Sequence, residues 1–232
     1  MLRAMLLGLV APLLAACVEG GTREPFETVT AGDALRAAVA SRVGGGGAAE
    51  AEAQAVDARR VLSAAVLAQV DKPVLLAIVR EADRGVAMAP VGVGADGTVQ
   101  WRDGTGAGLL LRGGVLVGTR GLGFDLLTVD DAGLRAALGA GGGRDVPRVE
   151  RRLRGDNVVV AERLFCDVVA VGRERLDYYG RSHATTRFEE RCAGDESAFV
   201  NTYWLGTDGL IRRQAVRVGP RAGVLETVVL RE

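Results

Sequence analysis

The sequence predicts a mainly β fold, with antiparallel sheets arranged as a sandwich or an open barrel-like meander and an N-terminal helix packed on the sheet. Short apolar runs of strand length follow one another after Pro73, separated by Gly, Asp and Asn. Several of these runs alternate between polar and apolar residues, as strands with one buried face do. No helical periodicity interrupts them, so neighbouring strands are expected to pair as hairpins.

The strands can be assigned in chain order. Thr98–Arg102 alternates clearly, and Leu109–Arg112 and Val115–Thr119 flank a Gly-Gly pair that is typical of a two-residue hairpin turn. The other expected strands are Val74–Arg80, Arg148–Arg154, Val158–Cys166, Ala198–Leu205, Leu210–Val218 and Val224–Arg231. Gly139–Gly143 is expected to be a flexible loop that divides the β region into two halves.

One helix is expected before the strands. Ala48–Val70 is rich in strong helix formers, and its apolar residues recur at roughly helical spacing. We expect its apolar stripe to lie on the sheet. A run of four glycines, Gly44–Gly47, separates this helix from a shorter expected helix, Ala34–Arg42.

The N-terminus is typical of a bacterial lipoprotein signal. Arg3 supplies a positive charge, and the apolar run Ala4–Leu14 is shorter than the roughly 20 residues that span a bilayer. Residues 1–16 are therefore expected to be a cleavable export signal. The run Leu14-Ala15-Ala16-Cys17 resembles the lipobox, in which signal peptidase II cuts before a lipid-modified cysteine. Cys17 is the expected lipid attachment site; an ordinary secretory signal with an incidental cysteine is the alternative.

Lipid attachment would place the protein on a membrane. Acyl chains such as palmitate contribute about 0.8 kcal/mol per buried CH₂, so the two or three chains of a lipoprotein hold it firmly. Val18 follows the cysteine, and by resemblance to well-studied lipoproteins the absence of Asp there favours the outer membrane. Residues 17–47 then form a tether with a short helix, and residues 48–232 form one β-rich periplasmic domain.

Two cysteines remain, Cys166 and Cys192. An even pair in an exported, oxidising compartment is expected to form a disulfide. Two free thiols or a metal pair are the alternatives. A zinc site would need further ligands, and the chain has one histidine, so we expect no metal and no cofactor.

No motif establishes catalysis. Gly92–Gly97 matches the dinucleotide pattern G-x-G-x-x-G, but a strand follows it where a helix would have to bind the pyrophosphate, so a loop is expected. Ser182 and His183 are adjacent, and neighbours on a strand point to opposite faces, so a Ser-His-Asp triad is not expected. The pairs Asp130-Asp131 and Glu189-Glu190 diverge in the same way, although carboxylates from distant strands can converge as in a glycoside hydrolase.

Aromatic residues make up only 4% of the chain, which draws attention to Trp101, Tyr203 and Trp204. Aromatic rings stack on sugar faces and arginine pairs with acidic sugars, so these three and Arg120 are candidates for a glycan or partner surface. The alternative is that they are core or rim residues, since one of Tyr203 and Trp204 must face inward on a regular strand.

Charge is balanced, with 29 basic and 29 acidic residues, which argues against a nucleic-acid binder. The strand Arg148–Arg154 places Arg148, Glu150, Arg152 and Arg154 on one face. A solvated face or edge-strand protection explains this as well as a ligand site does.

Several segments between Val74 and Leu230 share their order with a known family. They are Val99–Trp101, Leu111–Gly123, Asp125–Leu127, Phe165-Cys166, Glu190–Cys192, Asn201–Trp204, Gln214 and Gly219-Pro220. In these segments the chain resembles the YjbF/GfcB lipoprotein family, which is associated with exopolysaccharide and group 4 capsule production. It departs from the family at His183, where an aromatic such as Tyr is expected, and at Arg213, where Ser is usual.

The resemblance implies a periplasm-facing, largely β domain that acts with a large outer-membrane β-barrel and another periplasmic polysaccharide-export protein. It carries over no enzymatic activity and no catalytic residue. We therefore expect a non-enzymatic accessory factor in exopolysaccharide or capsule export, anchored at the periplasmic face of the outer membrane. The alternatives are a polysaccharide-modifying hydrolase, which would need carboxylates converging beside Trp101 or Trp204, and a chaperone or plug of an outer-membrane barrel. Direct binding of polysaccharide stays open.

Overall fold

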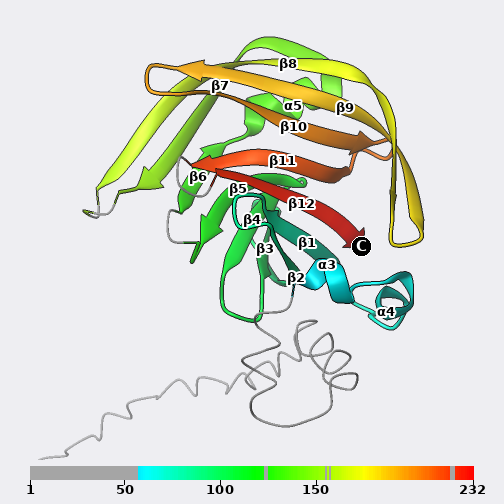
Figure 1. Ribbon diagram of the computed structural model, residues 1–232. Helices are drawn as coiled ribbons and strands as arrows, with labels where there is room; N and C mark the ends of the chain where they lie inside the picture. The colour runs from blue at the N-terminus through cyan, green and yellow to red at the C-terminus, as the bar shows by residue number, and fades with distance from the viewer. Residues whose placement is uncertain (1–56, 123–124, 155, 157, 220–222) are drawn as a thin grey trace, which may run out of the picture.

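The computed structural model describes residues 57–122, 125–154, 156, 158–219 and 223–232. The expected signal (1–16), Cys17 and the tether (17–47) lie outside these residues. The expected mainly β fold is confirmed. A single antiparallel sheet of twelve strands curls into a nearly closed barrel (Figure 1).

Strands that are consecutive in the chain are neighbours in the sheet, except that β12 lies between β1 and β11 and that β5 and β6 lie at opposite edges. The order in the sheet is β5-β4-β3-β2-β1-β12-β11-β10-β9-β8-β7-β6, so the last strand pairs with the first. The strands are β1 (Val74–Val79), β2 (Arg84–Val93), β3 (Thr98–Arg102), β4 (Gly108–Arg112), β5 (Val115–Arg120), β6 (Leu126–Asp130), β7 (Gly142–Leu153), β8 (Val159–Tyr178), β9 (Arg181–Gly194), β10 (Ala198–Gly206), β11 (Ile211–Gly219) and β12 (Gly223–Arg231). Strands β2, β6 and β9 were not expected from the sequence, and β8 runs twelve residues beyond Cys166.

Strand β2 carries the sheet around a corner. Its residues Arg84–Met88 pair with β1, whereas its later residues pair with β3. A bulge between Pro90 and Gly92 marks the change. Beyond this corner β3, β4 and β5 turn back, and their apolar side chains meet those of the other strands in one barrel core.

The single helix expected over Ala48–Val70 is, among the described residues, two short helices, α3 (Ala58–Val61) and α4 (Ala64–Ala68). Ser63 separates them, because its hydroxyl accepts a hydrogen bond of 3.2 Å from the Val66 amide and caps a new helix. The expected packing on the sheet is confirmed. Apolar residues of the helices and their flanks form a second cluster with the outer faces of β1 and β12: Ala58, Leu62, Leu67, Val70, Val74, Leu76, Val228 and Leu230.

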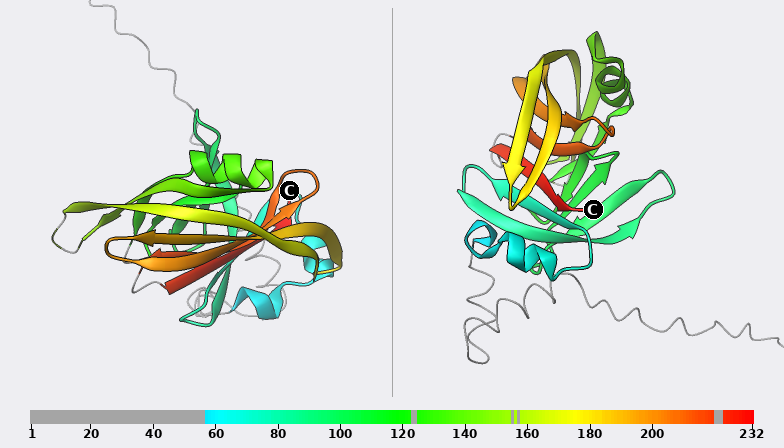
Figure 2. Two further views of the ribbon diagram at one scale, coloured as in Figure 1. Left: turned by 90° about the horizontal axis from the view of Figure 1, so that it is seen from above. Right: turned by 90° about the vertical axis from the view of Figure 1, so that its right-hand side faces the viewer.

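A third helix, α5 (Ala132–Ala140), lies between β6 and β7, where the sequence predicted no helix. Three of its residues, Leu134, Ala137 and Leu138, enter the barrel core. The loop predicted over Gly139–Gly143 is wrong: α5 extends through Ala140, Gly141 ends it at φ 83°, and β7 begins at Gly142. Figure 2 shows α5 on the opposite side of the molecule from α3 and α4.

The long hairpin of β8 and β9 bends around the outside of the barrel (Figure 1). Near its tip Leu176 packs with Trp204 and Ala215 in a small outer cluster. The Tyr178 hydroxyl donates a 2.9 Å hydrogen bond to the Val229 carbonyl on β12. Within the described part of the chain, no helix has the length and apolar character needed to cross a bilayer.

Candidate functional site

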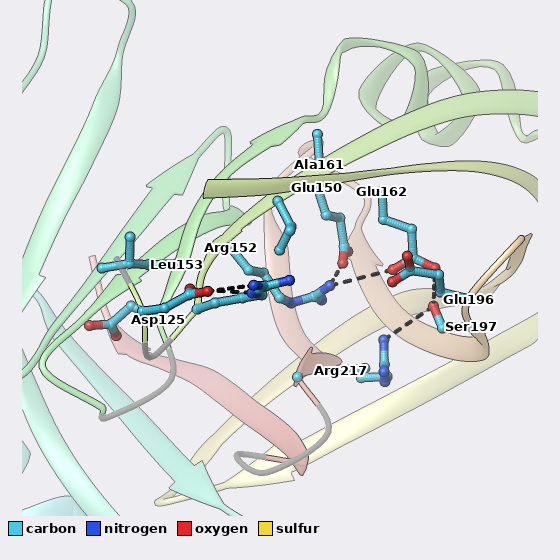
Figure 3. Close-up of a pocket in the computed structure, with 13 residues that line it drawn as sticks. Asp125, Glu150, Arg152, Leu153, Ala161, Glu162, Glu196, Ser197 and Arg217 are labelled. Carbon is cyan, nitrogen blue, oxygen red and sulfur yellow. Dashed lines mark hydrogen bonds and ion pairs between the residues drawn. The ribbon is translucent and has the colours of Figure 1, made fainter. Parts of the chain in front are cut away.

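A cavity of about 570 Å³ lies at the end of the barrel where β7 and β11 finish and β8 and β10 begin (Figure 3). Charged side chains dominate its lining. The carboxylates are those of Asp125, Glu150, Asp156, Glu162 and Glu196, and the guanidiniums are those of Arg152, Arg154 and Arg217. Because neighbouring strands are antiparallel, the end of one strand lies beside the start of the next. Residues far apart in the chain therefore meet at this end of the barrel.

Arg152 is the centre of the cavity's ion pairs. Its guanidinium binds the Glu150 carboxylate, lies 3.6 Å from a Glu162 carboxylate oxygen, and donates a 3.1 Å hydrogen bond to the Val218 carbonyl. Glu150 is fully buried and forms the inner wall. Three strands are thereby tied together at this end of the barrel.

The opposite wall comes from the turn between β9 and β10 and from the end of β11. The Ser197 hydroxyl donates a 2.5 Å hydrogen bond to Glu162 and lies 3.5 Å from an Arg217 nitrogen (Figure 3). The Arg217 guanidinium lies over the Phe199 ring, 5.0 Å from its centroid. Arg217 forms an ion pair with none of the described carboxylates, so most of its N–H groups are available to a ligand.

Behind the cavity lies a buried polar network. Arg148 donates to Glu150 at 2.8 Å and to Glu190 at 3.2 Å. The other Glu190 oxygen accepts hydrogen bonds from the Asn201 amide at 2.8 Å and the Tyr203 hydroxyl at 2.9 Å. All five side chains are at most 3% exposed. The network joins the cavity wall to the centre of the barrel.

The network changes the ionisation of its members. Burial raises the pKa of Tyr203 well above its ordinary value, and the neighbouring Glu190 charge adds to this effect. Burial alone would lower the pKa of Arg148, but the charges of Glu190 and Glu150 oppose it, and the pKa is raised. Arg148 therefore stays charged, and Tyr203 stays a hydrogen-bond donor.

Solvation and edge-strand protection, the alternatives to a ligand site for the Arg148–Arg154 face, do not account for Arg148 and Glu150. Arg148 and Glu150 are buried, and β7 is an interior strand of the sheet, between β6 and β8. Charge is tolerated there because Arg148 finds Glu190, which lies 42 residues away in the chain. At the other end of this face, Arg154 reaches the cavity and binds Asp156.

The Cys166–Cys192 disulfide is confirmed, and it links directly paired residues of β8 and β9. Both sulfurs lie within 4.8 Å of a Glu190 carboxylate oxygen in the barrel interior. The sulfurs are bonded to each other, and the carboxylate is occupied by Arg148, Asn201 and Tyr203. These three side chains therefore do not offer a metal site in this structure.

The structure does not bring the four candidate glycan residues together on an exposed face. Trp101 packs in the barrel core and is 8% exposed, and Tyr203 is fully buried. Trp204 lies on the outer face beneath the β8–β9 hairpin, 7% exposed, with the Arg213 guanidinium 4.5 Å from its ring centroid. Arg120 is exposed, but it binds backbone carbonyls. None of the four lines the cavity.

Arg120 belongs to a side-chain clasp between β5 and β6, which are the two edges of the sheet. Its guanidinium contacts the Leu126 and Leu127 carbonyls at 3.3–3.4 Å. The Thr119 hydroxyl accepts from the Leu126 amide at 3.0 Å and donates to Asp125 at 2.9 Å. Side chains thus close the barrel where the described residues form no backbone ladder.

Gln214 provides a second tie across the barrel. Its amide oxygen accepts a 3.1 Å hydrogen bond from the Leu116 amide, and its amide nitrogen donates to the Gly114 carbonyl at 2.7 Å. A side chain of β11 thereby satisfies backbone groups in and beside β5. Many of the segments that resemble a known family therefore serve to shape and close the barrel.

The remaining motifs have structural roles. Of the loop expected over Gly92–Gly97, Gly94–Gly97 forms the turn between β2 and β3, whereas Gly92 and Val93 are the last residues of β2. His183 stacks on Tyr178, with ring centroids 5.3 Å apart. The expected divergence of the acidic pairs is confirmed: Asp131 and Glu190 are buried, whereas Asp130 is exposed and Glu189 is only partly covered.

Sequence reasoning missed Glu196, Ser197 and Arg217, which line the cavity on the side opposite Arg152. The polar run Asp195-Glu196-Ser197 predicts only a turn, and its position opposite Arg152 depends on the register of β9 and β10. Arg217 sits in an alternating strand, where a charged residue normally indicates a solvated face. The long-range pairing alone makes these residues neighbours.

Comparison with known proteins places the chain in a family. The structure resembles the crystal structure of the hypothetical lipoprotein YmcC from Escherichia coli (K12), with a TM-score of 0.65 and 20% sequence identity over 74% of this chain and 89% of that chain. Among curated protein sequences none matches. Residues 32–230 match the family model described as group 4 capsule polysaccharide lipoprotein gfcB, YjbF. Since this match covers most of the chain, the protein belongs to the YjbF family of group 4 capsule polysaccharide lipoproteins.

Proposed function

We propose that this protein is a non-enzymatic accessory factor in exopolysaccharide or capsule export, held by a lipid on Cys17 at the periplasmic face of the outer membrane. The observation that carries the polysaccharide role is the family match over residues 32–230. The export step and the outer-membrane position are the finer parts of the proposal. Each has its own support in the chain.

Two features of the sequence and the structure support the proposed location at the periplasmic face of the outer membrane. The Leu14–Cys17 lipobox would give the mature chain acyl anchors. The Cys166–Cys192 disulfide is of the kind that persists in an oxidising compartment such as the periplasm. Val18 after the cysteine favours the outer membrane over the inner.

A non-enzymatic role is supported by how the cavity's carboxylates are used. Glu150 and Glu162 both bind Arg152, and Asp156 binds Arg154. Asp125 accepts hydrogen bonds from the backbone amides of the clasp. The hydrogen bond from Arg154 lowers the pKa of Asp156, whereas a general acid must hold a proton.

An outer-membrane β-barrel and a second periplasmic export protein are the proposed partners. An exposed apolar row on the barrel wall supports a protein contact: Pro147, Phe165, Ala193 and Ala198 are in-register neighbours on β7, β8, β9 and β10. Phe165 is 62% exposed, which is unusual for a large apolar side chain. A photo-crosslinker at position 165 should therefore capture one of these proteins.

The test is a chromosomal deletion. We expect surface or secreted polysaccharide to fall while the precursor sugars are still made. A copy in which a conventional cleavable signal peptide replaces residues 1–17 should appear in the soluble periplasmic fraction and restore export less well than the wild type. Unchanged polymer in the deletion strain would contradict the export role, and a wild-type protein that carries no acyl mass on Cys17 would contradict the lipid assignment.

A further inference from the structure

The cavity at the end of the barrel has the dimensions of a ligand site. Its volume of about 570 Å³ falls within the range of about 300–1,000 Å³ that is usual for small-molecule pockets. Strands β7, β8 and β11 supply most of its walls. Arg152 of β7 joins the three strands through its ion pair with Glu162 of β8 and its hydrogen bond to the Val218 carbonyl of β11. A site built on strands holds its polar groups in fixed positions.

The lining offers hydrogen-bond donors and acceptors side by side. Glu162 accepts from Ser197 and lies near Arg152, and Arg154 binds Asp156. A carboxylate in such a pair still has lone pairs to accept further hydrogen bonds, and Arg217 keeps N–H donors that no carboxylate of the described residues takes. A sugar hydroxyl both donates and accepts, so it can use neighbouring groups of both kinds.

The net charge of the cavity lining favours uncharged hydroxyl-rich ligands over acidic ones. The lining carries five carboxylates and three guanidiniums, which gives it a formal charge of −2. A ligand with carboxylate or phosphate groups would be repelled, because like charges in a partly enclosed site are weakly screened. An uncharged ligand meets no such barrier.

The cavity also has an apolar part. Leu153, Val160 and Ala161 line it at the ends of β7 and β8, and Leu153 and Val160 are 40% and 37% exposed. The C–H faces of a sugar ring can cover apolar side chains while its hydroxyls reach the charged groups. Ligand binding would thereby remove this apolar surface from water.

We propose that this cavity binds an uncharged, hydroxyl-rich saccharide segment of the polymer that the protein helps to export. The inference rests on the proposed function for the identity of the polymer, and on Arg217, Ser197 and Glu162 for the contacts. Through this site the protein would bind the exported polymer directly, in addition to contacting other proteins. The binding site is distinct from the four aromatic and basic residues that the sequence indicated.

The binding test uses residues 18–232, exported behind a conventional cleavable signal peptide that replaces residues 1–17 and purified from the periplasm. The probes are neutral tetrasaccharides of differing linkage, the corresponding tetrasaccharides carrying uronates, and inorganic phosphate. We expect calorimetry to detect binding of at least one neutral tetrasaccharide, and NMR to show shifts at Ser197 and Arg217. Arg217→Ala and Ser197→Ala should each weaken binding at least tenfold.

Arg191→Ala is the matched control, because Arg191 is an exposed arginine of β9 that pairs with Glu189 away from the cavity. It should leave binding unchanged. A urea unfolding curve like that of the wild type will show that each variant is folded. Three outcomes would overturn the proposal: no neutral probe binds, the uronates or phosphate bind more tightly, or binding survives Arg217→Ala and Ser197→Ala together.

The two proposals fail in different ways. If deletion of the gene lowers export but no neutral saccharide binds, the cavity inference fails and the proposed function stands. If a neutral saccharide binds as expected but deletion leaves export unchanged, the proposed function fails. Restoring the deletion with the Arg217→Ala, Ser197→Ala double variant links the two, and we expect this strain to export less polymer than one restored with Arg191→Ala.

Discussion

The Tyr203 hydroxyl donates a 2.9 Å hydrogen bond to the Glu190 carboxylate in the interior of the barrel, where Tyr203 is fully buried and Glu190 is 1% exposed. Arg148 supplies the countercharge from β7, and Asn201 supplies a further donor from β10. Each member of this network lacks access to water. Its partners must therefore replace the hydration that folding removes.

Removing the Glu190 carboxylate should destabilise the protein strongly. Glu190→Ala leaves the Arg148 charge buried with only Glu150 to balance it, and breaking a buried pair costs about 3–5 kcal/mol. Tyr203→Phe, which deletes one donor, should cost about 1–3 kcal/mol. Urea unfolding measures both changes. Glu189→Ala, on the neighbouring residue of the outer face, should cost less than about 1 kcal/mol, and an equal loss for Glu189→Ala and Glu190→Ala would contradict the prediction.

Loss of the disulfide should lower stability without changing the fold. The Cys166 and Cys192 positions are 26 residues apart, and closing a loop of that size contributes roughly 3–4 kcal/mol in the chain-entropy model. We expect the Cys166→Ala, Cys192→Ala double variant to unfold at correspondingly lower urea. Reductant should shift the wild type by a similar amount and leave the double variant unaffected. A wild type that is insensitive to complete reduction would contradict this account.

Asp125→Ala should open the barrel between β5 and β6. The Asp125 carboxylate accepts from the Thr119 hydroxyl and from the amides of Gly121 and Leu122. Without it, the amides of β6 should exchange with deuterium at least several-fold faster, whereas those of β10 and β11 should keep their protection. Asp208→Ala, in the turn between β10 and β11, is the control for loss of a turn aspartate. Equal acceleration across the whole sheet would indicate general destabilisation in place of a local opening.

His183 should make stability depend on pH below neutrality. Burial lowers its pKa, and the nearby Arg212 and Arg181 charges lower it further, against a smaller opposing effect of Asp208. The unfolded chain, with a histidine pKa of about 6.5, therefore binds a proton before the folded chain does. Stability is full above pH 6.5 and falls as the pH drops below it.

His183→Phe tests this assignment, because phenylalanine keeps an aromatic ring beside Tyr178 and removes a buried ring nitrogen that has no hydrogen-bond partner among the described residues. Urea unfolding at pH 7.5 and pH 5.5 should show a smaller loss of stability on acidification for the variant than for the wild type. The same loss in both proteins would assign the pH dependence to other groups. His183 is the one histidine of the chain, which simplifies the interpretation.

The strands that the sequence predicted have a local pattern that needs no knowledge of their partners. Thr98–Arg102 alternates, and Gly113-Gly114 marks the hairpin of β4 and β5, so these strands were found. Strand β9 was missed because both of its faces are polar over much of its length: Glu190 is buried, and Arg191 is exposed. Helix α5 was missed because Gly133 and Gly139 within it weaken the helical pattern.

The residues of the candidate site were harder to predict from the sequence than the strands were. The disulfide could be predicted, because the chain was expected to be exported and cysteines pair in an oxidising compartment. The burial of Arg148 could not, since it depends on Glu190 arriving from another strand in register. For the same reason the cavity could not be predicted, because β7, β8 and β11 must align before Arg152 and Arg217 face the same space.

The pairing of β12 with β1 has a consequence for how the chain folds. Strand β12 lies between β1 and β11, so it joins the β1–β5 half of the sheet to the β6–β11 half (Figure 1). A chain that crosses a membrane N-terminus first exposes the β1 edge long before β12 can cover it. Such distant pairing makes folding slow, and the two open edges are prone to aggregation meanwhile. If the chain is exported as proposed, a periplasmic chaperone that shields these edges should raise the yield of folded protein, and a chain truncated before Gly223 should stay dependent on that chaperone.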